Sequence, residues 1–259
     1  MKVAAVIPAR LQSTRLPGKP LRLIAGVPMI LRVLDRARAC PGLDRVIVAT
    51  DSEEIRRVIE SGQGEAWLTS PHHRTGSDRV AEVAEKLSED LILNLQGDEP
   101  LLPASTVSEL VEFGRNCKEL TVATAMIPLT HEGDIVNPGI VKVVGTVSGR
   151  ALYFSRLPIP YVKDSPLNTD ANPHSSRVCH GFHKHIGIYL YRRTFLLEFV
   201  RMSSTRLELS ESLEQLRILE HGLPIYLVKV SEDCISVDTT EVLALAELKF
   251  AAQEGTLHP

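Results

Sequence analysis

A cluster of basic and hydroxyl side chains follows the first apolar segment of the chain. Residues 3–8 are apolar, and the loop after them contains Arg10, Arg15 and Lys19 together with hydroxyl groups such as that of Ser13. Fixed cations and backbone N–H groups in one loop suit a triphosphate. The same composition also fits an ordinary solvated basic loop. The loop is not a Walker A sequence and no GxGxxG follows the strand, which disfavours P-loop and dinucleotide-binding folds.

Two carboxylates in the sequence could bind a divalent cation. Asp98 lies in Gln96-Gly97-Asp98-Glu99-Pro100, directly after an apolar segment, and Asp238 follows a second apolar segment. Mg²⁺ prefers oxygen ligands and often takes one or two carboxylates together with substrate phosphates. Gly-Asp and Glu-Pro pairs are also frequent in turns, and an Asp before a helix is often its N-cap. Turn and capping roles therefore remain open for both residues.

A polar pair in the second half could bind another ligand. Glu211 and Gln215 are four residues apart in a predicted helix at 206–220, so we expect them to project from one helix face. Such a pair beside an apolar stripe is also typical of a solvated helix edge. The stripe of this predicted helix consists of Leu209, Leu213, Leu216 and Leu219.

The sequence Cys179-His180-x-x-His183-x-His185 has a spacing that resembles a metal site. Cysteine and histidine are zinc ligands, but a structural zinc ion needs a complete tetrahedral set. His183 and His185 begin a predicted strand, whereas Cys179 precedes it, and no second cluster completes the set. We therefore favour His185 as a substrate contact. The chain has no CxxC pair, so neither a zinc ribbon nor a disulfide framework is predicted.

The elements that must position these residues alternate along the first half. Strands predicted at 3–8, 45–49 and 91–95 alternate with helices at 29–39, from Ser52 onward, and at 105–115. This rhythm favours an α/β fold with a mostly parallel twisted sheet and helices on both faces. Ligands of such sheets bind at the carboxyl ends of the strands, where the basic loop and Asp98 must lie.

The second half has a different pattern. A hairpin is predicted from 141–144 and 151–154 around Ser148-Gly149, with strands at 185–191 and 225–230 and a terminal helix at 239–252. The segment 163–177 is rich in Pro, Asn, Ser and Asp, which indicates a loop. We therefore predict one α/β domain over residues 1–259, interrupted by a smaller mixed-sheet subdomain at about 130–200.

Composition excludes several classes of protein. The 259 residues carry a net charge of −3, which argues against a nucleic-acid-binding protein. The apolar segment at the N-terminus is too short for a secretory signal, and no segment approaches the ~18 apolar residues of a membrane span. We therefore expect a soluble, cytoplasmic protein that acts on small molecules and not at a membrane.

Six strings resemble one enzyme family and occur in its order. The string Pro-Ala-Arg-x-x-Ser-Thr-Arg-Leu-Pro-Gly-Lys-Pro-Leu at 8–21 resembles the opening of the 3-deoxy-manno-octulosonate (Kdo) cytidylyltransferases, also called CMP-Kdo synthetases. The other five strings lie at 48–51, 75–79, 95–100, 151–156 and 213–217. The resemblance implies a nucleotide-diphospho-sugar transferase-like fold. It also implies Mg²⁺-dependent transfer of CMP from CTP to the anomeric hydroxyl of Kdo for lipopolysaccharide biosynthesis, by a homodimer.

The resemblance also implies a role for each matching residue. Arg10, Lys19, Asp98 and Asp238 would be catalytic, with Asp98 and Asp238 as the ligands of Mg²⁺. The nucleotide would be bound by Pro8, Ala9, Arg10, Ser13, Arg15, Lys19, Gly76, Ser77 and Gln96. The sugar acid would contact Gln96, Arg156, His185, Tyr189, Glu211 and Gln215, and the subdomain at 130–200 would provide dimerisation and sugar-binding surfaces.

A few positions depart from the family pattern and bear on specificity. Leu190 stands where members often have Gly, and Ser210 and Ser212 flank Glu211 where apolar or small residues are common. These departures concern the identity of the sugar and leave open 8-amino-Kdo or another acidic sugar. A catalytically silent nucleotide-binding module is the alternative of another class, although four retained catalytic residues argue against it. A glycosyltransferase is disfavoured because the chain has no DxD string.

Overall fold

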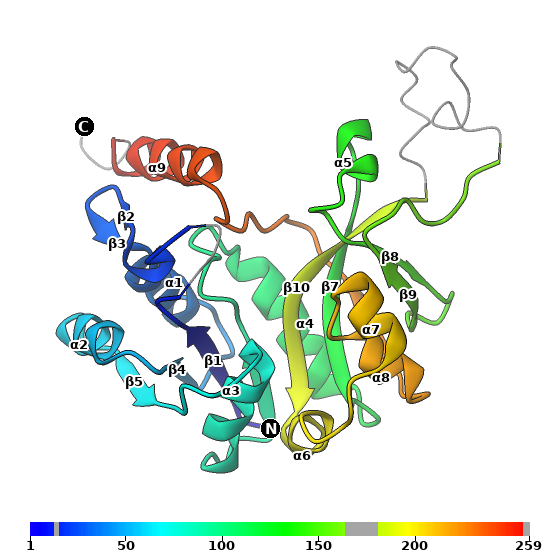
Figure 1. Cartoon of the computed structure of the whole chain (residues 1–259), viewed down its shortest axis with the longest axis horizontal. Helices are drawn as coiled ribbons and strands as arrows, with labels where there is room; N and C mark the ends of the chain where they lie inside the picture. The colour runs from blue at the N-terminus through cyan, green and yellow to red at the C-terminus, as the bar shows by residue number, and fades with distance from the viewer. Residues whose placement is uncertain (13–15, 164–180, 256–259) are drawn as a thin grey trace.

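The structure is a computed structural model of the chain, and it describes residues 1–12, 16–163 and 181–255. A large mixed sheet runs through the molecule in the strand order β11-β7-β10-β6-β1-β4-β5 (Figure 1). Ser13, Arg15, Cys179, His180 and the predicted loop beyond Lys163 lie outside the described residues. Along the sheet the strands are β1 (Val3–Ala9), β4 (Arg45–Thr50), β5 (Glu65–Leu68), β6 (Leu91–Asn94), β7 (Val122–Pro128), β10 (His183–Arg192) and β11 (Ile225–Lys229).

The first half forms the parallel part of this sheet, as predicted. β1 pairs in parallel with β4 on one side and with β6 on the other, and β4 pairs in parallel with β5. Residues Val3 to Ile7 of β1 are all fully buried. A strand covered by helices on both faces has no polar side, which explains the continuous apolar segment in the sequence. The carboxyl ends of β1 and β6 therefore lie side by side.

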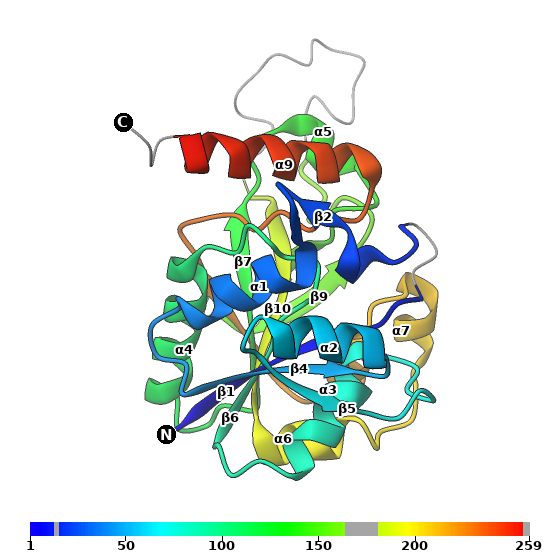
Figure 2. The same cartoon turned by 90° about the vertical axis from the view of Figure 1, so that its left-hand side faces the viewer.

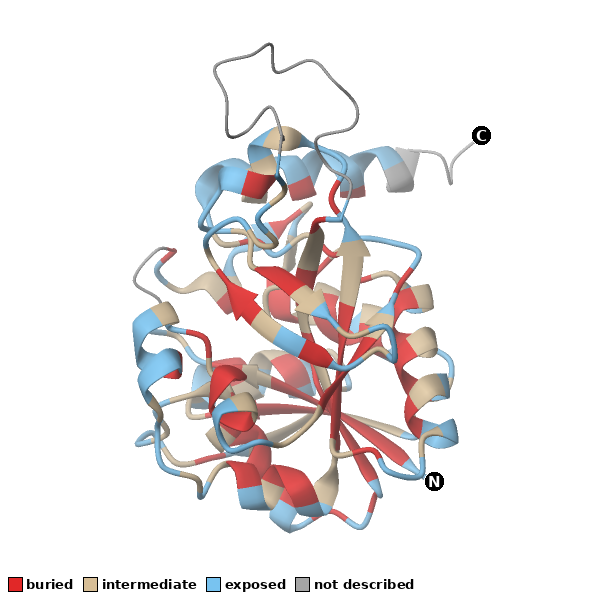
Figure 3. Ribbon diagram, turned by 90° about the vertical axis from the view of Figure 1, so that its right-hand side faces the viewer, coloured by how far each residue is buried: buried red, intermediate tan, exposed pale blue. Residues whose placement is uncertain are grey.

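Helices cover both faces of the sheet. On one face α1, α2 and α4 contribute apolar side chains to the same core cluster as the alternate residues Leu91, Leu93 and Leu95, and α9 joins this cluster over β2. On the other face α3, α6 and α8 pack against Ile92 and its neighbours. Figure 3 shows the buried residues concentrated in the strands between these layers. The helices are α1 (Met29–Arg38), α2 (Glu53–Ser61), α3 (Gly76–Glu85), α4 (Ala104–Asn116), α5 (Glu132–Val136), α6 (Arg193–Phe199), α7 (Arg206–Glu211), α8 (Leu216–Glu220) and α9 (Thr240–Gly255).

The second half forms the antiparallel part of the sheet. β10 runs antiparallel to both β6 and β7, and β7 pairs in parallel with β11. The predicted hairpin is present as β8 (Lys142–Gly145) and β9 (Ala151–Ser155). It joins β10 through the pair Lys184–Lys142, so it continues the main sheet and does not form a separate one. The division into a domain and a subdomain remains a prediction.

The predicted helix at 206–220 is wrong: the structure contains two short helices in its place. α7 ends at Glu211, Ser212 adopts a left-handed conformation with φ 53°, and α8 begins at Leu216. The N–H of Leu213 bonds the carbonyl of Glu208, which is the hydrogen bond of a helix-ending Schellman turn. Leu209 is consequently 68 % exposed, whereas Leu216 is fully buried.

A tertiary ion pair accompanies this break in the helix. Glu208 completes a capping box with Thr205 at the start of α7, and its carboxylate also binds the Arg217 guanidinium of α8. Both charged side chains are buried, so the pair holds α8 against α7. The spacing of leucines in the sequence does not predict an ion pair between two separate helices.

A small hairpin near the N-terminus was not predicted. β2 (Leu23–Ile24) and β3 (Val27–Pro28) form a separate antiparallel pair. The two turn residues, Ala25 and Gly26, both have positive φ, as a type I′ turn requires. In Figure 2, α9 lies above α1 and β2. Within the described ranges, no helix has both the length and the apolar character needed to cross a membrane.

Candidate active site

A cleft of about 380 Å³ opens at the carboxyl ends of β1 and β6, where the sequence predicts ligand binding. It is bounded by the end of β1, the start of α3, the segment after β6 and the segment before α9. Its lining residues are Pro8, Ala9, Arg10, Gln12, Lys19, Pro20, His73, Thr75, Gly76, Arg79, Gln96, Gly97, Asp98, Glu99, Gly187, Ser236 and Asp238.

The basic loop forms one wall of the cleft. Arg10 directly follows β1 and has an exposed side chain, and Lys19 opens a short 3₁₀ helix, Lys19–Leu21. The N–H of Gly18 bonds the carbonyl of Leu11 and so closes the loop at its base. Gly18 has φ +65°, a conformation that costs a side-chain-bearing residue free energy. The predicted contacts Ser13 and Arg15 lie outside the described residues.

The N-terminus of α3 forms a second wall. Thr75 caps the helix through a reciprocal capping box with Asp78, and Gly76 occupies the first helical position. Free backbone N–H groups and the helix dipole make such an end suitable for an anion. Ser77 was predicted to line the nucleotide pocket, but its side chain is not among the lining groups. It is 3 % exposed and its hydroxyl donates to Glu214.

Lys19 lies between the two predicted metal ligands. Its Nζ is 2.5 Å from Oδ2 of Asp98 and 2.7 Å from Oδ1 of Asp238. Burial alone would lower the pKa of Lys19, but the two carboxylates outweigh it and the pKa is raised. Burial raises the pKa of Asp98, and the nearby carboxylate of Asp238 adds to this effect, while Lys19 opposes it. Lys19 is therefore a firmly charged ammonium at neutral pH.

Backbone contacts bring Asp238 beside Asp98, although 140 positions separate them in the chain. The N–H of Val237 bonds the carbonyl of Asp98 at 2.8 Å. Gly97 allows the end of β6 to approach β1 closely, because an added Cβ would lie 3.0 Å from the carbonyl oxygen of Pro8. The position of the two carboxylates is therefore set by the ends of two segments that are distant in sequence.

Glu99 and Ser236 reinforce this junction and were missed by the sequence analysis. The Ser236 hydroxyl donates to Oε1 of Glu99 at 2.5 Å, which ties the segment before α9 to the end of β6. Burial raises the pKa of Glu99 to about 7, against the opposing hydrogen bond from Ser236. The adjacency of Glu99 to Asp98 was the only available signal, and nothing local distinguishes it from a turn residue.

The residues at this junction fit a hard divalent cation. Asp98 and Asp238 offer carboxylate oxygens that face each other across the Lys19 ammonium. The Oε2 atom of Glu99 is buried, and no described residue hydrogen-bonds it. Two carboxylates open to a cleft match the way Mg²⁺ is held with substrate phosphates. Within the described residues, no group of three or more His, Cys, Asp or Glu side chains is placed to hold a metal ion, so the junction offers two carboxylates and leaves the other coordination positions to other oxygen atoms.

Most residues predicted to contact the sugar lie in the second half, outside this cleft. Gln96 is the one member of that set that lines the cleft. Gly187, which was not in the predicted set, also lines it and lies on β10 between His185 and Tyr189. His185 Nε2 is 2.9 Å from the hydroxyl of Thr124, and burial lowers the pKa of His185 to about 3. His185 is therefore neutral at physiological pH. Its ring packs edge-on against Phe154.

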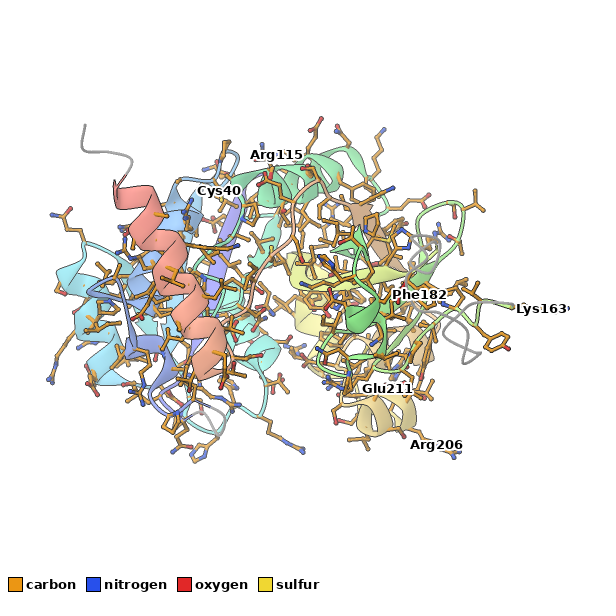
Figure 4. All side chains as sticks on the ribbon, turned by 90° about the horizontal axis from the view of Figure 1, so that it is seen from above. Cys40, Arg115, Lys163, Phe182, Arg206 and Glu211 are labelled. Atoms are coloured by element: carbon orange, nitrogen blue, oxygen red, sulfur yellow. The ribbon has the colours of Figure 1, made fainter. Side chains whose placement is uncertain are left out.

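The pair Glu211 and Arg156 is bound together at the edge of the second half. The Ser155 hydroxyl donates to Glu211 at 2.7 Å, and the backbone N–H of Arg156 donates to it at 3.0 Å. The Arg156 guanidinium donates in turn to the Glu211 carbonyl at 2.8 Å. Seen from above, Glu211 and Phe182 lie in the half away from α9 (Figure 4). This arrangement orients the Glu211 carboxylate, whatever ligand it meets.

Gln215 does not project beside Glu211 as predicted. The left-handed residue Ser212 turns the chain between them, and Gln215 precedes α8 with 5 % exposure. The Nε2 atom of Gln215 is buried, and no partner for it occurs among the described residues. The prediction of one shared helix face is therefore wrong.

Two other motif strings meet beside the cleft. The Arg79 guanidinium, 3 % exposed, donates to Asp51 at 2.9 Å and also to the Thr69 hydroxyl. Nε2 of His73, a lining residue that the sequence analysis missed, lies 2.5 Å from Oε2 of Glu82. These contacts brace the α3 wall against the end of β4.

Comparison with known proteins agrees with this geometry. The profile of the cytidylyltransferase family matches residues 4–230. A 3-deoxy-manno-octulosonate cytidylyltransferase of Pelobacter propionicus is 42 % identical over 97 % of this chain and 98 % of its own. The enzyme of the same name from Geotalea daltonii is 44 % identical over 92 % of this chain and 94 % of its own.

A solved structure has the same fold along its whole length. It is a CMP:2-keto-3-deoxy-manno-octonic acid synthetase complexed with CTP, with a TM-score of 0.87 and 38 % identity, over 98 % of this chain and 100 % of that one. The matches to the Pelobacter propionicus enzyme and to the solved structure cover the cleft, both carboxylates and the second half. This chain belongs to the cytidylyltransferase family, among the 3-deoxy-manno-octulosonate cytidylyltransferases.

Proposed function

We propose that the chain transfers CMP from CTP to the anomeric hydroxyl of 3-deoxy-D-manno-octulosonic acid, releasing pyrophosphate. The observation that carries the proposal is the cleft in which Asp98, Asp238 and Lys19 meet beside the basic loop. Near-complete coverage of relatives that bear this activity in their names supports the same conclusion. The product is an activated sugar, and we assign it to lipopolysaccharide assembly in the cytoplasm, where CTP is available.

The reaction is a displacement at the α-phosphorus of CTP. A bond forms between the anomeric oxygen and phosphorus, the bond to the bridging oxygen breaks, pyrophosphate leaves and the hydroxyl proton is released. Arg10 and Lys19 offset the negative charge on the departing phosphates, because both are cations in the cleft wall. The N–H groups at the start of α3 orient the nucleotide. The chain's contribution is therefore positioning and charge, without a covalent intermediate.

We propose Mg²⁺ as the cofactor, held by Asp98 and Asp238. When bound, it supplies charge neutralisation for the phosphates and polarises the nucleophile. Glu99, behind the two aspartates, keeps them at their spacing through Ser236 and the backbone. Titration with Mn²⁺ in the presence of CTP, read by electron paramagnetic resonance, tests the site without turnover. We expect Asp98→Asn to weaken the signal of bound metal and an exposed Glu119→Gln to leave it unchanged.

We propose that the sugar acid contacts Gln96 in the cleft and His185, Glu211 and Arg156 in the second half. A neutral His185 offers a hydrogen bond without adding charge, and the oriented carboxylate of Glu211 accepts from hydroxyl groups. Gly187 lines the cleft on the strand that carries His185, so the two regions are continuous along β10.

We also propose that the protein is a homodimer joined through the second half. Large apolar side chains are exposed there on β9 and after it, including Leu152, Leu157 and Tyr161. Scattered exposed leucines are normal, but several on one part of the surface are typical of an interface. Light scattering should give twice the 28.6 kDa chain mass, and Leu152→Asp should reduce it. A single-chain mass for the unchanged protein would contradict the dimer.

Pyrophosphate release tests the proposed function directly. The protein is assayed with CTP, Mg²⁺ and each of Kdo, 8-amino-Kdo and N-acetylneuraminic acid, with ATP, GTP and UTP as nucleotide controls. We expect release with CTP and Kdo. Folded protein that releases no pyrophosphate with any sugar would refute the enzyme assignment, and preference for another sugar would refute the substrate.

A further inference from the structure

A row of four polar side chains, half-buried at its two ends and buried in the middle, connects the cleft to the second half. Gln96 Nε2 donates to Asn94 Oδ1 at 3.2 Å, and Asn94 Nδ2 donates to the Ser77 hydroxyl at 3.4 Å. Ser77 in turn donates to Oε2 of Glu214 at 2.8 Å. Asn94 is 1 % exposed at the end of β6, and Glu214 lies just before α8. The row therefore links β6, α3 and the start of α8.

The direction of this row follows from the chemistry of its end. The carboxylate of Glu214 accepts hydrogen bonds, and Ser77 has a single proton, which it gives to Glu214. The Ser77 oxygen must then accept from its other hydrogen-bonded neighbour, the amide of Asn94. Asn94 has its N–H₂ group toward Ser77, so its carbonyl oxygen faces Gln96 and accepts from it. Ser77 thereby orients the Asn94 amide, and Asn94 orients the Gln96 amide.

The consequence appears at the surface of the cleft. Because Gln96 gives its N–H₂ group to Asn94, its Oε1 atom is directed elsewhere. That oxygen lies next to Gly76, 3.9 Å from where a Cβ of that residue would be. Gln96 and Gly76 both line the cleft. A ligand at this wall therefore meets a carbonyl oxygen, which accepts a hydrogen bond.

We propose that Glu214, acting through Ser77 and Asn94, is a positioning residue that fixes the Gln96 amide with its oxygen toward the cleft. The site thereby selects a ligand group that donates a hydrogen bond. This inference rests on the proposed function, in which two ligands offer such a group: the amino group of cytosine and a hydroxyl of the sugar acid. UTP lacks the amino group, so the first case would contribute to the choice of nucleotide.

The substitution Glu214→Met should reverse the row. It keeps the length of the side chain but removes the acceptor, so the Ser77 proton turns to the Asn94 carbonyl. Asn94 then offers its N–H₂ group to Gln96, and Gln96 presents N–H₂ to the cleft. A donor would face a donor on the ligand. One mismatched hydrogen bond of this kind should raise a KM about tenfold or more.

The test measures KM for CTP and for Kdo in the full-length enzyme. We expect Glu214→Met to raise one of the two, and the substrate affected identifies the donor group. Glu214→Gln retains an acceptor oxygen and should restore most of the loss. Glu220→Met is the matched control. Glu220 is the last residue of α8 and accepts hydrogen bonds from the backbone N–H groups of Leu207 and Glu208 in α7, but it is outside the row. Its KM values should stay unchanged.

A double-mutant cycle separates positioning from general loosening. In a Gln96→Ala background, Glu214→Met should raise KM no further, because the group through which it acts is gone. An equal rise in both backgrounds, or no rise in folded Glu214→Met protein, would overturn the inference. If Glu214→Met does not fold, Ser77→Ala interrupts the row with a smaller change and is judged by the same cycle.

A readout without turnover keeps this inference distinct from the proposed function. The side-chain N–H₂ resonances of Gln96 in ¹⁵N-labelled protein, assigned by their loss in Gln96→Ala, should shift in Glu214→Met and stay in place in Glu220→Met. Unshifted resonances in Glu214→Met would overturn the inference whatever the activity. Shifted resonances in an inactive protein would support it while the proposed function failed.

Discussion

The two halves of the sheet hold their polar residues in different ways. In the parallel half, the groups of the cleft extend from strand ends and loops, and Lys19, Asp98 and Asp238 remain partly exposed. In the antiparallel half, His185 is buried on a strand within a row of aromatic rings, and the Glu211 carboxylate is bound by the Ser155 hydroxyl and the Arg156 N–H. The first half presents charge to a ligand, whereas the second presents oriented neutral or fully bonded groups.

This difference fits the division of work that we propose between the two halves. A displacement at phosphorus needs charge that can meet and leave phosphate groups, so its residues must be accessible. Selection of a sugar needs hydrogen-bonding groups with fixed directions, and burial in a packed row provides them. Substitutions in the parallel half should therefore change turnover, and those in the antiparallel half should change stability and KM.

The largest effect is expected at the carboxylate junction. Asp98→Asn removes one of the two charges that we propose hold Mg²⁺, while its size is kept. We expect kcat to fall on the order of 10²–10³-fold, the scale of losing one electrostatic contact to the transition state. The measurement is pyrophosphate release, with unfolding followed in parallel. Asp134→Asn in α5 is the control, and near-normal turnover in folded Asp98→Asn would remove Asp98 from the mechanism.

Acid should destabilise the antiparallel half through His185. Burial lowers its pKa to about 3 in the folded protein, against about 6.5 in an unfolded chain. The unfolded state therefore binds the proton first as the pH falls, so stability is lost from about pH 6.5 down to about pH 3. Between pH 6.5 and pH 5 this group should account for ~2 kcal/mol of the loss.

Urea unfolding at these two pH values measures the effect. His185→Gln should lose less stability on acidification than the unchanged protein, by that amount. His183→Gln, on the same strand but half-buried, is the control and should keep most of the acid dependence. An unaltered pH slope in His185→Gln would mean that other groups cause the acid loss.

Close packing at the strand ends should make the parallel half sensitive to one added methyl group. Gly97→Ala places a Cβ 3.0 Å from the carbonyl oxygen of Pro8, which should cost about 1–2 kcal/mol of unfolding free energy. Gly133→Ala in α5 is the matched control, because its Cβ would meet nothing within 4 Å. Equal denaturation midpoints for the two variants would show that the β1–β6 approach tolerates a side chain.

The smallest effect is expected where the helix breaks in the second half. Ser212→Val forces a β-branched residue into the left-handed conformation at φ 53°, which should cost about 1 kcal/mol. Ser210→Val, exposed in α7, makes the same chemical change in helical backbone and should be near neutral. If both variants had the stability of the unchanged protein by thermal unfolding, the turn at Ser212 would be free to adopt another conformation.

Local pattern was sufficient for most of the fold. The apolar segments that became β1, β4 and β6, and the helix signals that became α1, α2 and α4, were predicted within a few residues of their observed ends. Ser52 is the N-cap of α2, as the acidic residues after it indicated. The hairpin β2–β3 was missed because each of its strands has only two residues. Two residues are too few to show the alternation of apolar and polar side chains by which a strand is recognised in a sequence.

The sequence by itself determined the alternation of strands and helices and, through it, the strand ends at which Arg10 and Asp98 lie. It also determined the family, because six strings occur in order. Only the tertiary structure decided the neighbours: Asp238 beside Asp98 through Val237, Glu99 bonded to Ser236, and the amide row from Glu214 to Gln96. It likewise broke the predicted helix at Ser212. Periodicity reports what a residue does within its own element, whereas these contacts join segments that meet only after the sheet has formed.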